Sequence, residues 1–145
     1  MLNVESIESG TVIDHIKAGK GKRVMDLLKI DDSFQNRVAV VMNVPSKKLG
    51  KKDIVKIEGM FVSDDVANLI ALIAPNSTIN IIKNSEVANK FVVSLPKDLK
   101  GVGTCGNPNC ITNFEYCEKS FRREDGDTFR CNYCERVFKA EELVK

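Results

Sequence analysis

Several features common in other protein classes are missing from this 145-residue chain. It has no tryptophan, a single histidine and no cysteine before residue 105. It also lacks the run of about 20 apolar residues that a helix needs to cross a bilayer. The first stretch, MLNVESIESG, has no basic start, apolar stretch or cleavage site, so it does not predict a secretory signal. Because hydrophobic residues make up 43% of the chain, we expect a packed core. The missing membrane span and signal predict a cytoplasmic protein without a membrane partner.

Catalytic and nucleotide-binding sequence motifs are missing as well. The segment GKGKR is too short and too poor in glycine for a Walker-type or dinucleotide-binding loop. No nucleophile can be grouped with a base and an orienting residue. The sequence therefore predicts a binding protein with no catalytic residues, not an enzyme.

A strong excess of positive charge is also missing. The net charge is +2, and residues 102–145 carry 7 lysines and arginines against 8 acidic residues, a net of −1. A cysteine-rich module that binds DNA or RNA is normally basic, because phosphate neutralisation supplies much of its affinity. This balance predicts no nucleic-acid partner, and a zinc-ribbon nucleic-acid-binding protein remains the alternative function.

All five cysteines lie in the last third of the chain. Cys105 and Cys110 are separated by four residues and Cys131 and Cys134 by two, with Cys117 between the pairs. Paired thiols in a reducing compartment favour one structural Zn²⁺ held by Cys105, Cys110, Cys131 and Cys134, because four thiolates leave no open position for catalysis. Reduced core cysteines or two disulfides are the alternatives. The setting FEYC predicts a strand around Cys117.

The alternation of apolar residues divides the chain into two domains. Residues 1–96 show a β-α-β-β-α-β order with one further strand, which is typical of an α+β ferredoxin-like sandwich: an antiparallel sheet with two helices on one face. The expected strands cover residues 11–16, 37–44, 53–61, 78–82 and 89–94, and the expected helices cover residues 22–30 and 64–74. Residues 97–101 form the expected linker. Residues 102–145 form the expected small all-β zinc-binding domain, whose folding the metal should drive because its core is small.

Charged and polar residues on the expected strands form a candidate ligand site. Lys52 and Lys56 share one face of a strand because they are four residues apart. Asp14, His15, Asn80 and Lys90 also lie on expected strands. Such a cluster could hold a polyphosphate together with a sugar or base. The alternative is that the lysines form a solvated sheet face and that His15 is structural.

Five segments, taken in order, resemble the regulatory chain of aspartate carbamoyltransferase. They are VESIESGTVIDHI, GKKDIVKIEG, APNSTINIIKNSEVANK, SLP and CGNPNC…CNYCE. The resemblance implies a non-catalytic subunit of a hetero-oligomer that controls pyrimidine biosynthesis. Its first domain would bind CTP, UTP or ATP as allosteric effectors. Its zinc domain would contact the catalytic chain, and the regulatory chain would itself form a homodimer.

The resemblance also implies roles for individual residues. Asp14 would hold ribose hydroxyls, and the phosphates would lie beside His15. The implied nucleotide-binding residues are Glu5, Ser6, Ile7, Val12, Asp14, His15, Lys52, Lys56, Asn80, Ile82, Ser85, Val87 and Lys90. The implied contacts to the catalytic chain are Asn107, Asn109 and Glu135. The zinc ligands of the family fall on the two cysteine pairs.

Overall fold

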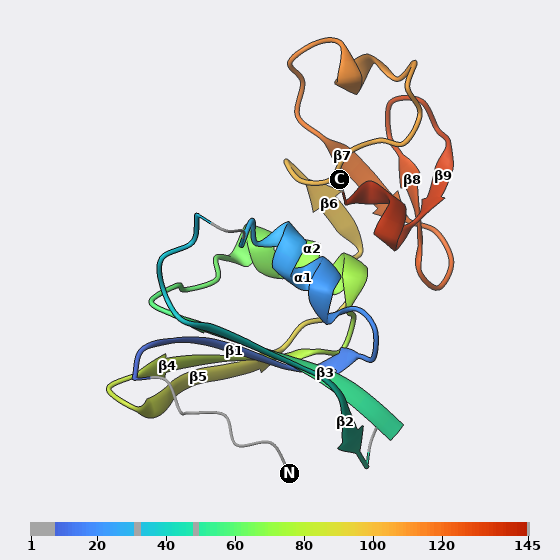
Figure 1. Ribbon diagram of the computed structural model, residues 1–145. Helices are drawn as coiled ribbons and strands as arrows, with labels where there is room; N and C mark the ends of the chain where they lie inside the picture. The colour runs from blue at the N-terminus through green and yellow to red at the C-terminus, as the bar shows by residue number, and fades with distance from the viewer. Residues whose placement is uncertain (1–7, 31–32, 48–49, 145) are drawn as a thin grey trace.

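A computed structural model describes residues 8–30, 33–47 and 50–144. Its N-terminal unit contains a five-stranded antiparallel sheet in the order β2-β3-β1-β4-β5. The strands are β1 (Gly10–Lys17), β2 (Val38–Ser46), β3 (Gly50–Glu58), β4 (Thr78–Lys83) and β5 (Glu86–Val92). Helices α1 (Gly21–Leu27) and α2 (Asp64–Ile73) both cover one face of this sheet (Figure 1). Because β3 lies between β1 and β2, the ferredoxin-like prediction is confirmed.

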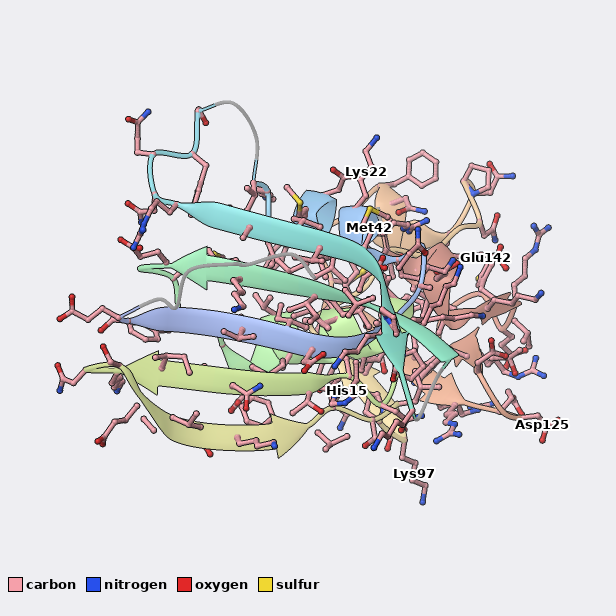
Figure 2. The ribbon with its side chains drawn as sticks, turned by 60° about the horizontal axis from the view of Figure 1, so that its bottom comes forward. His15, Lys22, Met42, Lys97, Asp125 and Glu142 are labelled. Carbon is pink, nitrogen blue, oxygen red and sulfur yellow. The ribbon has the colours of Figure 1, made fainter. Side chains whose placement is uncertain are left out.

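Apolar side chains between the sheet and the helices form the core of the N-terminal unit. Ile13, Val55 and Ile57 on the strands and Val24 and Ile70 on the helices are fully buried. Burial of such a side chain contributes about 1.5–3 kcal/mol. Because successive side chains of a strand point to opposite faces, the residues between these buried ones lie on the other face of the sheet. The helices leave that face open. Figure 2 turns this open face toward the viewer and labels His15 beside the central strands.

Local signals explain where α2 begins and where β1 can start. The Ser63 side chain accepts a hydrogen bond from the Val66 amide, and Asp64 lies in the first turn, as expected at a helix N-terminus. Gly10 begins β1 with φ at +153°, and a Cβ there would lie 2.1 Å from the Ile57 carbonyl oxygen. Only glycine permits this close approach of β1 to β3.

The hairpin of β2 and β3 extends further than the sequence predicts. Pro45, Ser46 and residues 50–52 lie between the two expected strands, but they extend β2 and β3, with Pro45 opposite Lys51 and Ser46 opposite Gly50. A proline is acceptable there because β2 is an edge strand among the described strands and pairs with β3 alone in that part of the chain. The longer hairpin carries Lys51 and Lys52 on regular strand.

The C-terminal unit is built from four short strands and two single turns. A second antiparallel sheet has the order β6-β7-β8-β9, as expected for a small all-β domain. The elements are β6 (Asp98–Lys100), η1 (Ile111–Asn113), β7 (Ser120–Arg123), β8 (Thr128–Cys131), β9 (Val137–Lys139) and η2 (Ala140–Leu143). Leu99, Phe121, Phe129 and Leu143 form its core. Strand β6 lies inside residues 97–101, the expected linker, and pairs with β7.

The two cores meet at α2. Ile70 and Ile73 pack in the N-terminal core, whereas Leu72, which is 2% exposed, packs with the core of the C-terminal unit. Val144 contacts both cores. Figure 1 shows η2, drawn in red, above the two helices. Among the helices that the described residues form, none combines the length and the apolar character of a membrane span.

Candidate metal centre and effector site

Four cysteine sulfurs converge in the C-terminal unit. Cys105 and Cys110 precede η1, Cys131 ends β8 and Cys134 lies in the turn before β9. The Sγ atoms of Cys105 and Cys134 are 3.6 Å apart, those of Cys110 and Cys131 are 3.8 Å apart, and all four lie within 4.8 Å of one another. A tetrahedron with Zn–S bonds of about 2.3 Å has edges of about 3.8 Å. The sulfurs therefore fit one metal ion, and they lie too far apart for disulfides of about 2.05 Å.

Asparagine side chains shape the loop that presents the first pair of thiols. Oδ1 of the Asn107 side chain accepts a hydrogen bond from the backbone amide of Asn109 at 3.1 Å. The Asn113 side chain donates to the backbone carbonyls of Cys105 at 3.2 Å and Asn107 at 2.8 Å. These hydrogen bonds stabilise the loop that connects Cys105 and Cys110. Three residues were expected to contact the catalytic chain. Asn107 is buried, whereas Asn109 and Glu135 are exposed.

The four thiols differ in the direction in which their surroundings shift the pKa. Burial raises the pKa of Cys105 to about 12 and also raises the pKa of Cys131. Burial acts the same way on Cys134, but hydrogen bonds from the Arg136 backbone and the Asn107 side chain outweigh it and lower its pKa to about 7. In Cys110, hydrogen bonds from Thr112 likewise overcome burial and lower the pKa. Because a bound metal requires thiolates, loading the site displaces the protons of Cys105 and Cys131.

Cys117 lies outside this cluster. It is part of an irregular segment between η1 and β7, and its Sγ contacts the Glu115 carbonyl at 3.6 Å. The expectation of a strand around Cys117 was wrong, because the chain turns at Phe114 and becomes regular again only at Ser120.

A row of candidate effector residues crosses the open face of the N-terminal sheet. Val12 of β1 lies opposite Lys56 of β3 on one side and Asn80 of β4 on the other, and Asn80 lies opposite Lys90 of β5. The Asn80 amide donates to the Val12 carbonyl at 3.5 Å. Residues that are far apart in the sequence therefore share one band of the sheet, with a lysine on each side.

An ion pair and a bulge lie beside this row. Lys52 Nζ is 3.0 Å from Asp14 Oδ1. The Lys52 side chain is 17% exposed and the Asp14 side chain is 25% exposed, so the pair is largely shielded from water. The β1–β3 register shifts between Ile13 and Ile16, and His15 has φ at +56°. This bulge turns both Asp14 and His15 away from the core. His15 Nδ1 lies 3.2 Å from the Thr78 hydroxyl.

A cavity of about 1000 Å³ opens next to the bulge. His15, Lys17 and Lys51 contribute its titratable side chains, and Ala18, Gly50, Pro75 and Asn76 complete its lining. His15, which follows Asp14, is the residue of the bulge that lines the cavity, whereas strand alternation turns Lys51 to the face opposite Lys52. Lys51 was missed in the sequence because the end of the β2–β3 hairpin was expected to be a loop, and Lys17 was missed because the first strand was expected to end at residue 16.

The remaining expected nucleotide-binding residues lie at the β4–β5 hairpin. Ile82 is opposite Val87, and Ser85 occupies the turn with φ at +66°. The Ser85 amide donates to the Glu8 carbonyl at 2.8 Å, which joins the hairpin to the residue where the described chain begins. Glu5, Ser6 and Ile7 lie outside the described residues.

Asp53 is a functional candidate that sequence reasoning missed. It is fully buried in β3, and its carboxylate accepts the backbone amides of Gly19, Gly21 and Asn43 at 2.9–3.0 Å. The available signal was an acidic residue at a core-facing position, in alternation with Val55 and Ile57.

Comparisons with known proteins agree with this architecture. Residues 2–94 match the family model described as "Aspartate carbamoyltransferase regulatory chain, allosteric domain", and residues 97–144 match the corresponding "metal binding domain". Regulatory chains from Pyrococcus horikoshii and Thermococcus gammatolerans are 50% and 46% identical, each over 99% of this chain and 96% of the relative. The chain from Methanococcus vannielii is 50% identical over 93% of this chain and 91% of its own length. This chain therefore belongs to the aspartate carbamoyltransferase regulatory chain family, with an allosteric domain followed by a metal-binding domain.

Proposed function

We propose that this chain is the non-catalytic regulatory subunit of a cytoplasmic aspartate carbamoyltransferase. Residues 1–96 bind nucleotide effectors, residues 97–101 connect the two domains, and residues 102–145 hold one zinc ion and dock on the catalytic chain. The observation that carries the proposal is the Lys52–Asp14 pair, which lies among further lysines on an open sheet face of the same chain that brings four thiols together.

The chemistry of the open face suits a nucleoside triphosphate such as CTP, UTP or ATP. The Asp14 carboxylate can accept ribose hydroxyls, and Lys52, Lys56 and Lys90 can neutralise phosphate oxygens. Val12, Ile82 and Val87, with backbone groups of the hairpin turn, would enclose the base together with Glu5, Ser6 and Ile7. The neighbouring cavity has a volume of about 1000 Å³, at the upper end of the range for ligand pockets.

Replacing Lys90 by alanine is expected to weaken nucleotide binding about 10-fold, because the nucleotide loses one charged hydrogen bond between the lysine and a phosphate oxygen. Lys90 is exposed and lies on the edge strand β5, so folding and assembly should not change. Titration calorimetry with CTP and with ATP measures the effect. Lys100→Ala, on the short edge strand β6 of the other unit, is the matched control. Equal affinities for the Lys90 variant and the control would contradict this site.

The surface of the C-terminal unit supports docking on another protein. Phe114 and Tyr116 are 72% and 106% exposed and lie near Ile111 and Tyr133, which are also exposed. Exposed aromatic groups of this kind are typical of protein interfaces. They lie near the metal centre, together with the exposed Asn109 and Glu135. The zinc-ribbon alternative gains no support, since Arg122 and Arg130 both form ion pairs with Glu124.

Mixing the metal-loaded chain with an aspartate carbamoyltransferase catalytic trimer tests the assembly. We expect the two chains to co-elute in gel filtration as a complex in which regulatory homodimers link catalytic trimers. The complex should respond to nucleotides, whereas the regulatory chain alone should show no turnover. Separate elution of the two chains in the presence of zinc would contradict the proposal.

A further inference from the structure

One buried carboxylate joins the candidate effector strand to the loop between β1 and α1. Asp53 follows Lys52 in β3, so strand alternation turns Lys52 to the open face and Asp53 to the core. Asp53 Oδ2 accepts the amides of Gly19 at 3.0 Å and Gly21 at 2.9 Å. A Cβ on Gly21 would lie 3.0 Å from the same oxygen, so loop and carboxylate are in close contact. Two hydrogen bonds and this close contact therefore connect β3 directly to the loop.

The other side of Asp53 is fixed to β2. Its Oδ1 accepts the Asn43 amide at 3.0 Å, at the point where the β2–β3 register shifts between Val41 and Val44. The β1–β3 register shifts opposite, next to the Ile16–Asp53 pair. Asp53 thus lies between two bulges, one of which carries Asp14. Bulges are places where strands bend, so this end of the sheet can respond to a ligand on Asp14.

The loop that Asp53 holds also reaches the C-terminal unit. Lys20, between the two glycines, places its Nζ 2.6 Å from Glu141 Oε1 of η2. Arg23 of α1 donates from Nη2 to the backbone carbonyls of Glu141 at 3.3 Å and Val144 at 3.4 Å. The last turn of the C-terminal unit is therefore held by the same loop and helix.

The single turn η2 also lies next to the metal centre. The Leu143 carbonyl accepts the Thr104 amide at 2.7 Å, and Thr104 directly precedes Cys105. A cavity of about 260 Å³ lies beside the Lys20–Glu141 pair, with lining from both units that includes Leu72 and Asp127. The boundary between the two units thus combines the Lys20–Glu141 ion pair with a cavity, which leaves space for the units to shift.

We propose that the Lys20–Glu141 ion pair, positioned by Asp53, couples the effector site to the metal-binding domain. The inference rests on the proposed function. A nucleotide that competes with Asp14 for Lys52 changes the contacts of the residue next to Asp53. A ligand shifts a conformational equilibrium only by its differential affinity for the two states. When the loop moves relative to η2, the distance between Lys20 and Glu141 changes. The ion pair therefore contributes a different energy to the conformation before and after the movement. Lys20 and Glu141 are thus positioning residues, which act on the catalytic chain through the metal-binding domain.

The test uses the complex reconstituted from the metal-loaded regulatory chain and the catalytic trimer. The readout is the fold-change in half-saturating aspartate that CTP or ATP produces. Lys20→Gln and Glu141→Gln should each reduce this fold-change by about 1.5- to 5-fold, the range for a partly exposed ion pair. Nucleotide affinity by calorimetry and co-elution with the catalytic trimer should not change. The charge-swapped double variant, Lys20→Glu with Glu141→Lys, should recover part of the response, because the pairing of opposite charges and not the packing of either side chain carries the effect.

Lys22→Gln is the matched control. It removes the same charge from the exposed start of α1, where Figure 2 labels Lys22, and it leaves Lys20 and Glu141 unchanged. If the unmodified complex responds to nucleotides and the Lys20 variant responds equally, the inference is overturned while the proposed function stands. No recovery in the swapped variant would also overturn it. If the unmodified complex responds to no nucleotide, both fail.

Discussion

Replacing Cys131 by serine is expected to unfold the C-terminal unit and abolish docking on the catalytic chain, while the five-stranded sheet remains folded. Cys131 is fully buried, lies 3.8 Å from Cys110 through its sulfur, and is opposite Phe121 in the second sheet. A structural zinc ion contributes about 10–16 kcal/mol of folding free energy in small domains. The C-terminal core, built around Phe121 and Phe129, is too small to replace that contribution.

Three measurements check this result. Elemental analysis should show one metal ion per unmodified chain and a strong loss in the variant. Amide exchange at Phe121 and Phe129 should become fast, whereas exchange at Ile13 and Val55 should remain slow. Gel filtration should show no complex with the catalytic trimer. The control is Cys117→Ser, which should keep both metal and complex because Cys117 lies outside the cluster. A Cys131 variant with full metal content and slow exchange would rule out the proposed ligand set.

Local sequence patterns were sufficient for the parts of the molecule that local chemistry determines. The even spacing correctly predicted that Lys52 and Lys56 share one face of β3, and the buried Val55 and Ile57 lie on the other face. Ser63 and the two following aspartates marked the start of α2. The spacing of the cysteine pairs predicted their convergence, because two short turns can each supply two ligands of a tetrahedral ion.

Long-range pairing determined the parts that the sequence did not reveal. Asp14 and His15 are neighbours, so alternation would turn one of them into the core, yet the β1 bulge turns both away. The bulge depends on register with β3, which no local pattern encodes. The expected linker likewise contains β6, which becomes a strand only because β7 pairs with it. Asp53 looked like a misplaced charge until the fold brought the amides of Gly19, Gly21 and Asn43 around it.

Replacing Asp53 by alanine is expected to lower the free energy of unfolding of the N-terminal unit by about 3 kcal/mol or more. The substitution leaves the amides of Gly19, Gly21 and Asn43 without their acceptor, and a hydrogen bond to a charged group contributes about 1.5–3 kcal/mol. Urea denaturation of the metal-loaded chain, followed by exchange of these amides, measures the effect. The amides of Gly19, Gly21 and Asn43 should lose protection before those of Ile13 and Ile57, which lie in the sheet core.

Two further variants show whether the carboxylate itself is responsible. Asp26→Ala removes an exposed aspartate from α1 and should change stability by less than about 0.5 kcal/mol. Asp53→Asn keeps the shape of the side chain and one acceptor oxygen, but turns an NH₂ group toward backbone donors. It should therefore lie between the control and Asp53→Ala. If the asparagine variant were as stable as the unmodified chain, shape alone would hold the loop. Lys20 would then have no charged anchor connecting it to the effector strand.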